Sequence, residues 1–304
     1  MALTLLEAAK LATDPLQKGV ISIFASSSPI LERLPFFDVA GMAYRYNQEQ
    51  TLPGIAFRGI NGSYTESTGI LNPQVESLYV MGGLSAVDRA LVKTQGNVND
   101  LRATYDGMKA KAAALTFTDK FFNGDNSTSP HEFDGMVNRL TGSQVIDAGS
   151  TSGGDALTLA KLDELMDSVS GSPDILLMNK TMRRKVNALV RAAGQAIETV
   201  SDAFGRQMLS YAGCPIGIVE ENKDGNAILP FTEDNPGGGT AASCSIYAVR
   251  FGAVEYVSGL QAGPMEVIDL GLNITNYQTL IEWIVGLGVF HPKAAARLQG
   301  IKNA

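Results

Sequence analysis

The segment from Tyr277 to Leu298 constrains the fold most, because it holds the most apolar run of the chain. Between Tyr277 and Val289 alternate side chains are almost all apolar, and the positions between them include Gln278, Glu282 and two glycines. A period of two predicts a β-strand. At about thirteen residues it is much longer than the usual ~5–6. The only tryptophan, Trp283, falls on the apolar face, and we expect it in the core.

A membrane anchor is the main alternative for this segment, and its length excludes it. The apolar run from Leu280 to Phe290 is about half of the ~20 residues that a membrane span needs. At the N-terminus, Glu7 and Lys10 interrupt the apolar core that a signal peptide requires. That end predicts a short amphipathic helix, whose apolar face comprises Leu3, Leu6 and Ala9. We therefore expect an intracellular product with no membrane partner.

A long amphipathic helix is predicted over residues 97–122. Its side chains recur at alternating steps of four and three residues, as one face of a helix requires. The stripe comprises Leu101, Tyr105, Met108, Ala112, Leu115, Asp119 and Phe122, of which only Asp119 is polar. The helix would be ~39 Å long at 1.5 Å per residue, and the strand ~40 Å at ~3.3 Å per residue. Because the helix and the strand have similar lengths, we predict that they pack against each other. We expect the core between them to contain Leu101, Tyr105, Met108 and Trp283.

Residues 41–80 predict a long β-hairpin with no obvious core beneath it. Tyr44 and Tyr46 alternate with polar residues, and turn signals lie at Pro53-Gly54 and Asn61-Gly62. Because an isolated hairpin is marginally stable in water, we expect this one to rest on another subunit. Charge pairs can set the register of such a contact. The contact residues we predict are Arg45, Glu49, Arg58, Tyr64 and Glu66.

Residues 152–270 predict an α/β lobe. One helix follows Thr158, and a second begins after Asn179 and stops at Gly194. Strands are predicted in "DILLM", "PIGIVE" and "SIYAVRF", with a long exposed loop over residues 221–240. The chain is long enough for two lobes, because single cores stop growing near ~250–300 residues.

No pattern of catalytic or metal-binding residues appears. His131 and His291 are the only histidines, and there is no CxxC pair, phosphate-binding loop or nucleophile elbow. Cys214 and Cys244 could form one disulfide, but we favour two free buried thiols. The net charge of -7 argues against a dedicated nucleic-acid binder. We predict no enzyme activity, no cofactor and no metal.

Six stretches occur in an order that carries a family resemblance. They are "YRYNQEQTLPGIAFRGINGSY", "FFNGDNSTSPHEFDGMVNRL", "PDILLMNKTMRRKVNALV", "FGRQMLSYAGCPIGIVE", "SIYAVRFG" and "IEWIVGLGVFHPKAAARLQGI". Together with the predicted elements, they resemble the major capsid proteins of tailed bacteriophages. These have the HK97-like α+β fold that encapsulin shells share.

The resemblance implies an assignment for each part of the chain. Residues 1–40 would be an N-terminal arm and 41–80 the extended hairpin called the E-loop. Residues 81–151 and 271–304 would form the peripheral (P) domain, with its spine helix at about 97–122 and the long strand. Residues 152–270 would form the axial (A) domain.

The implied function is self-assembly. Hexamers and pentamers of the chain would form an icosahedral phage head around double-stranded DNA, held without sequence specificity. The protein would be made in the cytoplasm of a bacterial host and reside in the virion. The implied partners are portal and scaffolding proteins and, in some heads, a decoration protein. The chain starts directly at the arm, so we expect any scaffold to be a separate protein.

One feature of the family's maturation bears on this chain. In the member that gives the family its name, maturation links an E-loop lysine to a neighbour's asparagine. Residues 41–80 contain no lysine, so we expect no such link from this hairpin. Two alternatives stay open: an encapsulin-type container whose cargo is protein, and a hydrolase that uses His131 or His291.

Overall fold

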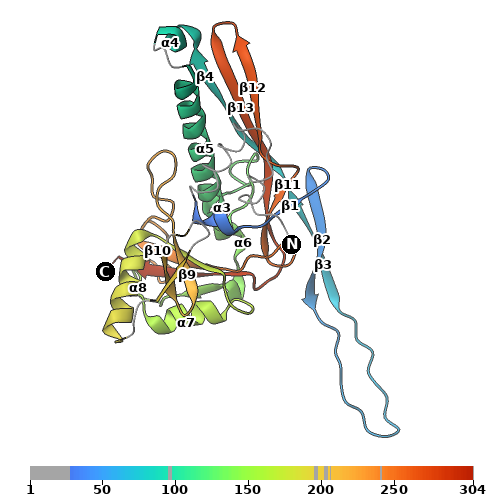
Figure 1. Cartoon of the computed structure of the whole chain (residues 1–304). Helices are drawn as coiled ribbons and strands as arrows, with labels where there is room; N and C mark the ends of the chain where they lie inside the picture. The colour runs from blue at the N-terminus through green and yellow to red at the C-terminus, as the bar shows by residue number, and fades with distance from the viewer. Residues whose placement is uncertain are drawn as a thin grey trace.

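The computed structural model describes residues 28–94, 98–194, 198–201, 205, 207–239 and 242–303. The helix predicted around Leu3, Leu6 and Ala9 lies outside the described residues. The molecule is elongated: a sheet and a long helix extend to one end, a rounder lobe lies beside them, and a thin hairpin projects from their junction (Figure 1). The order of elements is mixed α and β, as the predicted α+β class requires.

The elongated part is built on a five-stranded sheet. Its central strand, β13 (Asn276–Val289), has 14 residues and confirms the strand predicted from the alternation. It pairs antiparallel with one strand along one side and with two shorter strands in succession along the other. The other members are β1 (Phe36–Asp38), β4 (Tyr79–Asp88), β11 (Val257–Gln261) and β12 (Glu266–Asn273).

The predicted long helix is α5 (Val98–Asn123), of 26 residues, and it packs against β4 and β13. The predicted face was wrong in its first half, because Tyr105 is 47% exposed and Met108 63% exposed. The side chain of Leu101 lies outside the described residues. The buried face instead runs through Asp106, Ala110 and Ala114, where small side chains bring the helix backbone close to the sheet.

Trp283 lies between the sheet and α5, as predicted. Its side chain is buried, with ring centroids 4.9 Å from Phe36 of β1 and 5.7 Å from Phe117 of α5. Its indole Nε1 donates a hydrogen bond to Gln261 Oε1 at 3.2 Å. The aromatic contacts join three elements that are distant in the sequence, so Trp283 fixes the helix on the sheet.

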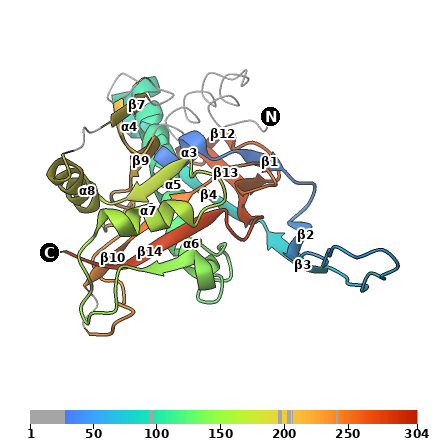
Figure 2. The same cartoon turned by 90° about the horizontal axis from the view of Figure 1, so that it is seen from below.

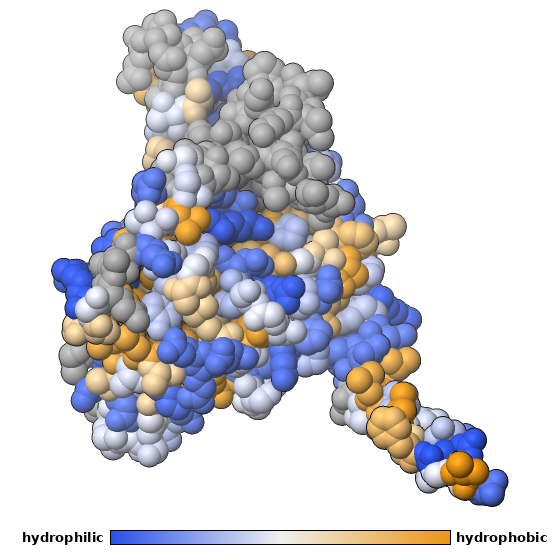
Figure 3. Space-filling model, turned by 60° about the horizontal axis from the view of Figure 1, so that its bottom comes forward, coloured by the Kyte–Doolittle hydropathy of each residue, from blue (hydrophilic) through white to orange (hydrophobic). Residues whose placement is uncertain are grey.

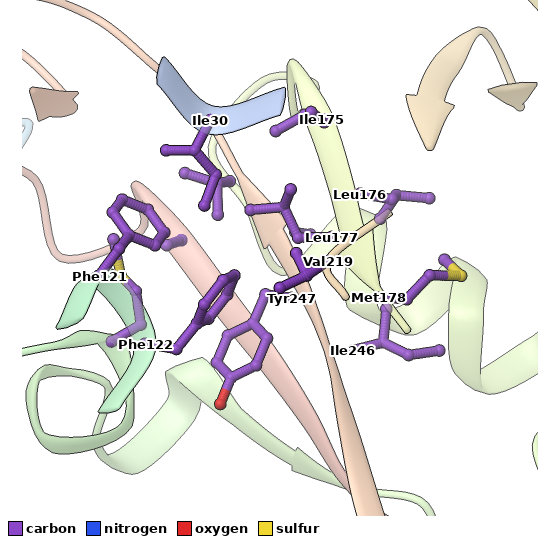
Figure 4. Packing of buried hydrophobic residues seen from close by; sticks show 14 of the residues in the cluster. Ile30, Phe121, Phe122, Ile175, Leu176, Leu177, Met178, Val219, Ile246 and Tyr247 are labelled. Atoms are coloured by element: carbon purple, nitrogen blue, oxygen red, sulfur yellow. The ribbon is translucent and has the colours of Figure 1, made fainter. Parts of the chain in front are cut away.

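The lobe is built on a seven-stranded sheet in the order β5-β14-β10-β6-β9-β8-β7. Two helices begin as predicted, because the side chains of Thr158 and Asn179 cap the N-termini of α7 and α8. Gly194, with a φ of +72°, lies just beyond the C-terminus of α8, where the second helix was predicted to stop. Phe122 of α5 packs against Tyr247 of β10, with the ring centroids 5.0 Å apart and the rings tilted, which joins the lobe's core to that of the elongated part (Figure 4). The elements are β5 (Val145–Asp147), β6 (Ile175–Met178), β7 (Glu198–Ser201), β8 (Gln207–Tyr211), β9 (Cys214–Ile218), β10 (Ser243–Val249), β14 (Ala295–Lys302), α7 (Leu159–Asp167) and α8 (Lys180–Ala192).

The two sheets divide the chain differently from the predicted ranges. β11 and the first half of β12 fall within 152–270, yet both strands pair with β13 in the elongated part. β5 and β14 fall within 81–151 and 271–304, yet they belong to the lobe's sheet. The chain passes from β13 in one sheet to β14 in the other after a short turn. The sequence of an apolar strand does not specify which of the two sheets it joins.

Short helices connect these layers. α4 packs near the far end of the elongated part, and α6 packs against α5. They are α3 (Pro29–Arg33), α4 (Arg89–Thr94), α6 (Met136–Arg139) and the 3-10 turn η1 (Gly142–Gln144).

Candidate assembly surfaces

The projecting hairpin is formed by β2 (Ala43–Thr51) and β3 (Ile70–Ser77). The strands pair antiparallel from Ala43 opposite Ser77 to Thr51 opposite Ile70, which confirms the predicted hairpin. Beyond them, residues 52–69 continue outward without a strand ladder. Figures 1 and 2 both show this part standing clear of the body, so its side chains contact little of their own subunit.

Few hydrogen bonds hold the outer part of the hairpin. The backbone N–H of Gly54 donates to Ser67 Oγ at 2.6 Å, and that hydroxyl donates to Gly54 O at 3.1 Å. At the tip, Gly62 N donates to Gly59 O at 3.1 Å and Asn61 has a φ of 68°. The loop therefore has a defined turn but no core of its own.

The base of the hairpin is anchored firmly to the body. Tyr46 donates its hydroxyl to Val289 O at 3.1 Å, and its ring lies 4.6 Å from that of Phe290. Glu76 of β3 forms an ion pair with Arg139 of α6, with N–O distances of 2.6 and 2.7 Å. Burial, followed by the nearby charge of Glu76, raises the pKa of Tyr46 to about 12. The direction of the hairpin is therefore set at its root.

All five predicted contact residues lie on the exposed surface of the hairpin: Arg45, Glu49, Arg58, Tyr64 and Glu66. The structure brings two of them together, because the Arg58 guanidinium lies 5.2 Å from the centroid of the Tyr64 ring. Arg58 Nη1 also donates to Gly62 O at 3.1 Å. Arg45 and Glu49 lie near the root, opposite Val75 and Leu71 in the ladder.

The sequence interpretation stressed charge and missed the apolar side chains of the loop. Ile55 is 96% exposed and Phe57 is as exposed as in an extended peptide, at 107%. Leu52 and Ile60 are also exposed, and Figure 3 shows orange apolar residues along the projecting arm. Such clustering is typical of interaction sites. The sequence did show these apolar residues, in a hairpin with no predicted core to cover them.

A second exposed apolar surface lies on the face of the five-stranded sheet opposite α5. Leu84, Leu280 and Ile268 stand side by side across β4, β13 and β12. Leu84 and Ile268 are exposed, and so is Val80, four residues before Leu84 in β4. We call Val80, Leu84, Leu280 and Ile268 the outer strip. Two acidic residues, Glu266 and Glu282, face each other in the row that lies between Leu84 and Val80.

The described residues contain no group of three or more His, Cys, Asp or Glu side chains that could hold a metal ion. Cys214 and Cys244 are free and buried, and burial raises the pKa of each thiol to about 12, which suppresses the thiolate. His291 Nδ1 accepts a hydrogen bond from Lys293 N at 3.0 Å, a turn-capping role. Among the described helices, none is both long and apolar enough to cross a membrane.

A protein-family model matches most of the first half of the chain. Residues 13–159 match the family model described as major capsid protein GP7. This match covers the hairpin, β4, α5 and the start of the lobe. No curated protein matches the chain.

Solved structures with a similar fold include an encapsulin, a capsid and a phage protein. A chain of the holo-SrpI encapsulin complex from Synechococcus elongatus PCC 7942 aligns over 100% of this chain and 98% of its own, with TM-score 0.67 and 18% identity. The capsid of the empty GTA particle aligns over 90% of both chains, with TM-score 0.62 and 13% identity. A chain from Mycobacterium phage Bobi aligns over 89% of both, with TM-score 0.58 and 13% identity. These likenesses confirm the predicted HK97-like fold.

Proposed function

We propose that this chain, which has the HK97-like fold, is a phage major capsid protein and that its copies assemble as hexamers and pentamers into a closed icosahedral head. The observation that carries the proposal is the hairpin arm. It holds large apolar side chains in water and is rigidly anchored only at its root. A monomeric protein gains nothing from such an arm, whereas a subunit gains a contact with its neighbour.

The surface that suits this arm is the outer strip of another copy. Both surfaces are apolar, and Arg58 at the end of the arm complements Glu266 and Glu282 beside the strip. In Figure 1 the arm points away from the five-stranded sheet, so in the proposed contact the two surfaces belong to different copies. Such a contact is heterologous, and a ring forms where its rotation closes. Each contact can be weak because every subunit makes many.

A charge-swap experiment tests this contact. We expect Arg58→Glu to lower the yield of closed shells by roughly tenfold, the effect of about 1.4 kcal/mol per contact, while the subunit folds normally. Arg58→Glu combined with Glu282→Arg is expected to recover part of the yield. Lys161→Glu, a reversal on α7 in the lobe, is the matched control and keeps wild-type yield. Closed shells are counted by negative-stain microscopy. An unchanged yield of shells in Arg58→Glu would contradict the proposed contact.

The cargo of the shell separates the two shell functions. We propose double-stranded DNA, packaged without sequence specificity, since the net charge of -7 suits a container that does not grip its contents. The likeness to the encapsulin supports a protein-filled container as the alternative. Particles purified from infected or expressing cells and treated with nuclease decide between them. Protected DNA of genome length supports the phage head, and empty or enzyme-filled particles support the container.

Further partners follow from the head function. We propose separate scaffolding and portal proteins, with a decoration protein as an additional partner, and synthesis in the bacterial cytoplasm. Because residues 41–80 hold no lysine, mature shells are expected to run as monomers on denaturing gels. Heavier covalent bands would contradict the absence of an isopeptide link from the hairpin.

A further inference from the structure

The chain contains two asparagine–glycine pairs, Asn61-Gly62 and Asn123-Gly124, and they lie in opposite surroundings. An asparagine followed by glycine readily loses its side-chain amide, because glycine has no side chain to hinder attack by its own backbone nitrogen. The reaction requires a backbone that is exposed and can move. The two pairs therefore test, within one molecule, how the fold controls this chemistry.

The first pair lies at the outer end of the hairpin, which stands clear of the body in Figures 1 and 2. Gly62 N donates to Gly59 O at 3.1 Å, and Asn61 has a φ of 68°. Asparagine is one of the few residues that this position of a type II turn accepts. Residues 52–69 are exposed throughout and form no strand ladder, so the turn can open without breaking much else.

The second pair is held at the end of α5. Gly124 N donates to Lys120 O at 3.0 Å, and Asn123 Nδ2 donates to Ile228 O at 3.0 Å. A Cβ at Gly124 would overlap Phe133 O, so the backbone is closely packed there. Attack by Gly124 N would require all of these contacts to be lost together. We therefore expect the second pair to be protected while the first is reactive.

We propose that Asn61 is a deamidation site and that its conversion limits the time for which a free subunit can join a shell. Gly62 N gives up its proton and attacks Asn61 Cγ. The N–Cγ bond forms and the Cγ–Nδ2 bond breaks, and the leaving nitrogen takes up a proton from solvent and departs as ammonia. Water then opens the five-membered succinimide to aspartate or isoaspartate. Both products carry a carboxylate, and isoaspartate also adds a methylene to the backbone.

The new carboxylate forms beside Arg58. Arg58 Nη1 donates to Gly62 O at 3.1 Å, and its guanidinium lies 5.2 Å from the centroid of the Tyr64 ring. A carboxylate at position 61 offers this guanidinium an ion pair within its own loop. That pair competes with Glu266 and Glu282 of another copy, so this consequence rests on the proposed function.

The chemical step is tested on the full chain as unassembled subunits in mildly alkaline buffer, with peptide mass spectrometry as the measurement. We expect Asn61 to convert at least roughly tenfold faster than Asn123, because the first turn opens more easily. The rate is expected to rise with pH, since the attacking nitrogen must lose its proton. Equal rates at Asn61 and Asn123 overturn the proposal.

Gly62→Ala supplies the matched control for this step. Its Cβ would lie 3.3 Å from Gly59 O, and the backbone there does not have a positive φ, so the exposed turn can accept it. The methyl group hinders the attack, so we expect slower conversion of Asn61 and unchanged conversion of Asn123. An unchanged rate at Asn61 in Gly62→Ala contradicts attack by this nitrogen.

The consequence for assembly is tested with two variants of one position. Asn61→Asp carries the charge of the product, and we expect it to lower the yield of closed shells roughly threefold, as suits an exposed ion pair. Asn61→Gly accepts the positive φ and cannot deamidate, so it is expected to keep wild-type yield after ageing, whereas aged wild-type subunits lose it. Equal yields from Asn61→Asp and Asn61→Gly overturn this consequence. If fresh wild-type subunits form no shells, the proposed function fails, whereas the rates at Asn61 and Asn123 still decide the chemical step.

Discussion

The guanidinium of Arg139 donates two hydrogen bonds to the carboxylate of Glu76, at 2.6 and 2.7 Å, and so ties the root of the projecting hairpin to α6. Both side chains are mostly buried, with 15% and 12% of their surface exposed. Arg139 Nε also donates to Asp134 O at 2.7 Å. This ion pair and Tyr46 fix the direction of the hairpin at its base. The outer part of the hairpin therefore keeps its direction with few contacts to its own subunit.

We predict that Arg139→Met lowers the free energy of unfolding of the subunit by about 3 kcal/mol, because removing one partner leaves a buried charge unpaired. Denaturant unfolding, followed by the fluorescence of the single tryptophan, measures the change. The double variant Arg139→Met with Glu76→Leu is expected to regain most of the loss, since no buried charge then remains. Equal losses in the single and double variants would contradict this account.

Tyr46 gives the hairpin root a dependence on alkaline pH. Burial raises its pKa from 10.0 to about 12, so the folded state keeps its proton where the unfolded state has lost it. Its contribution to stability is therefore complete below about pH 10 and is lost as the pH rises toward about 12. We predict that in Tyr46→Phe the free energy of unfolding falls less steeply with pH over this range. The slope should change by at most the amount that corresponds to about one proton. Unfolding midpoints at several pH values between 9 and 12 (~0.5 apart) test this; an unchanged slope in Tyr46→Phe would refute it.

The sequence predicts the elements that local patterns encode. The period of two located β13 and buried Trp283, and the side chains of Thr158 and Asn179 marked two helix starts. These features depend on residues close in the chain. The same holds for the hairpin, whose turn at Asn61 was visible as a dipeptide signal.

Features that depend on distant partners were not encoded locally. Asp106 is buried on α5 because Thr279 of β13 donates to it at 3.3 Å, and no helical pattern could anticipate that partner. As a result Tyr105, one position away, faces solvent. Likewise β14 joins the lobe's sheet because β10 is available there as a neighbour. The apolar side chains of the arm were missed for a similar reason, because their exposure depends on how far the hairpin stands from the body of the subunit.

A second buried charge network holds the long loop of the lobe. Arg297 of β14 donates through Nη2 to Glu233 Oε2 at 2.9 Å and through Nε to Ser245 Oγ at 2.9 Å, and Ser245 donates to Glu233. Glu233 belongs to the loop over residues 221–240, so the network attaches this loop to the sheet.

We predict that Arg297→Met costs about 3 kcal/mol of unfolding free energy and makes the loop over residues 221–240 more sensitive to proteolysis. Lys180→Met is the matched control, because its ion pair with Glu220, at 2.8 Å, is largely exposed to water. Exposed pairs contribute little, so the control is expected to stay within about 0.5 kcal/mol of wild type. Denaturant titration and limited proteolysis measure both effects, and equal sensitivity of the two variants would show that the buried network does not hold the loop.

The last prediction concerns the close packing of β1 against β11. Phe36 of β1 lies directly over Gly259 of β11, its partner in the ladder, and a Cβ at Gly259 would overlap the phenyl ring. The ring cannot move aside, because it is buried against Trp283 and Phe117. Gly259→Ala is therefore expected to destabilise the subunit by about 1–3 kcal/mol through overpacking. Gly263→Ala, in the connection that follows β11, meets no atom within 4 Å and is expected to change stability by less than about 0.5 kcal/mol. Denaturant unfolding of both variants measures the difference, and a Gly259→Ala variant as stable as Gly263→Ala would show that the aromatic layer yields.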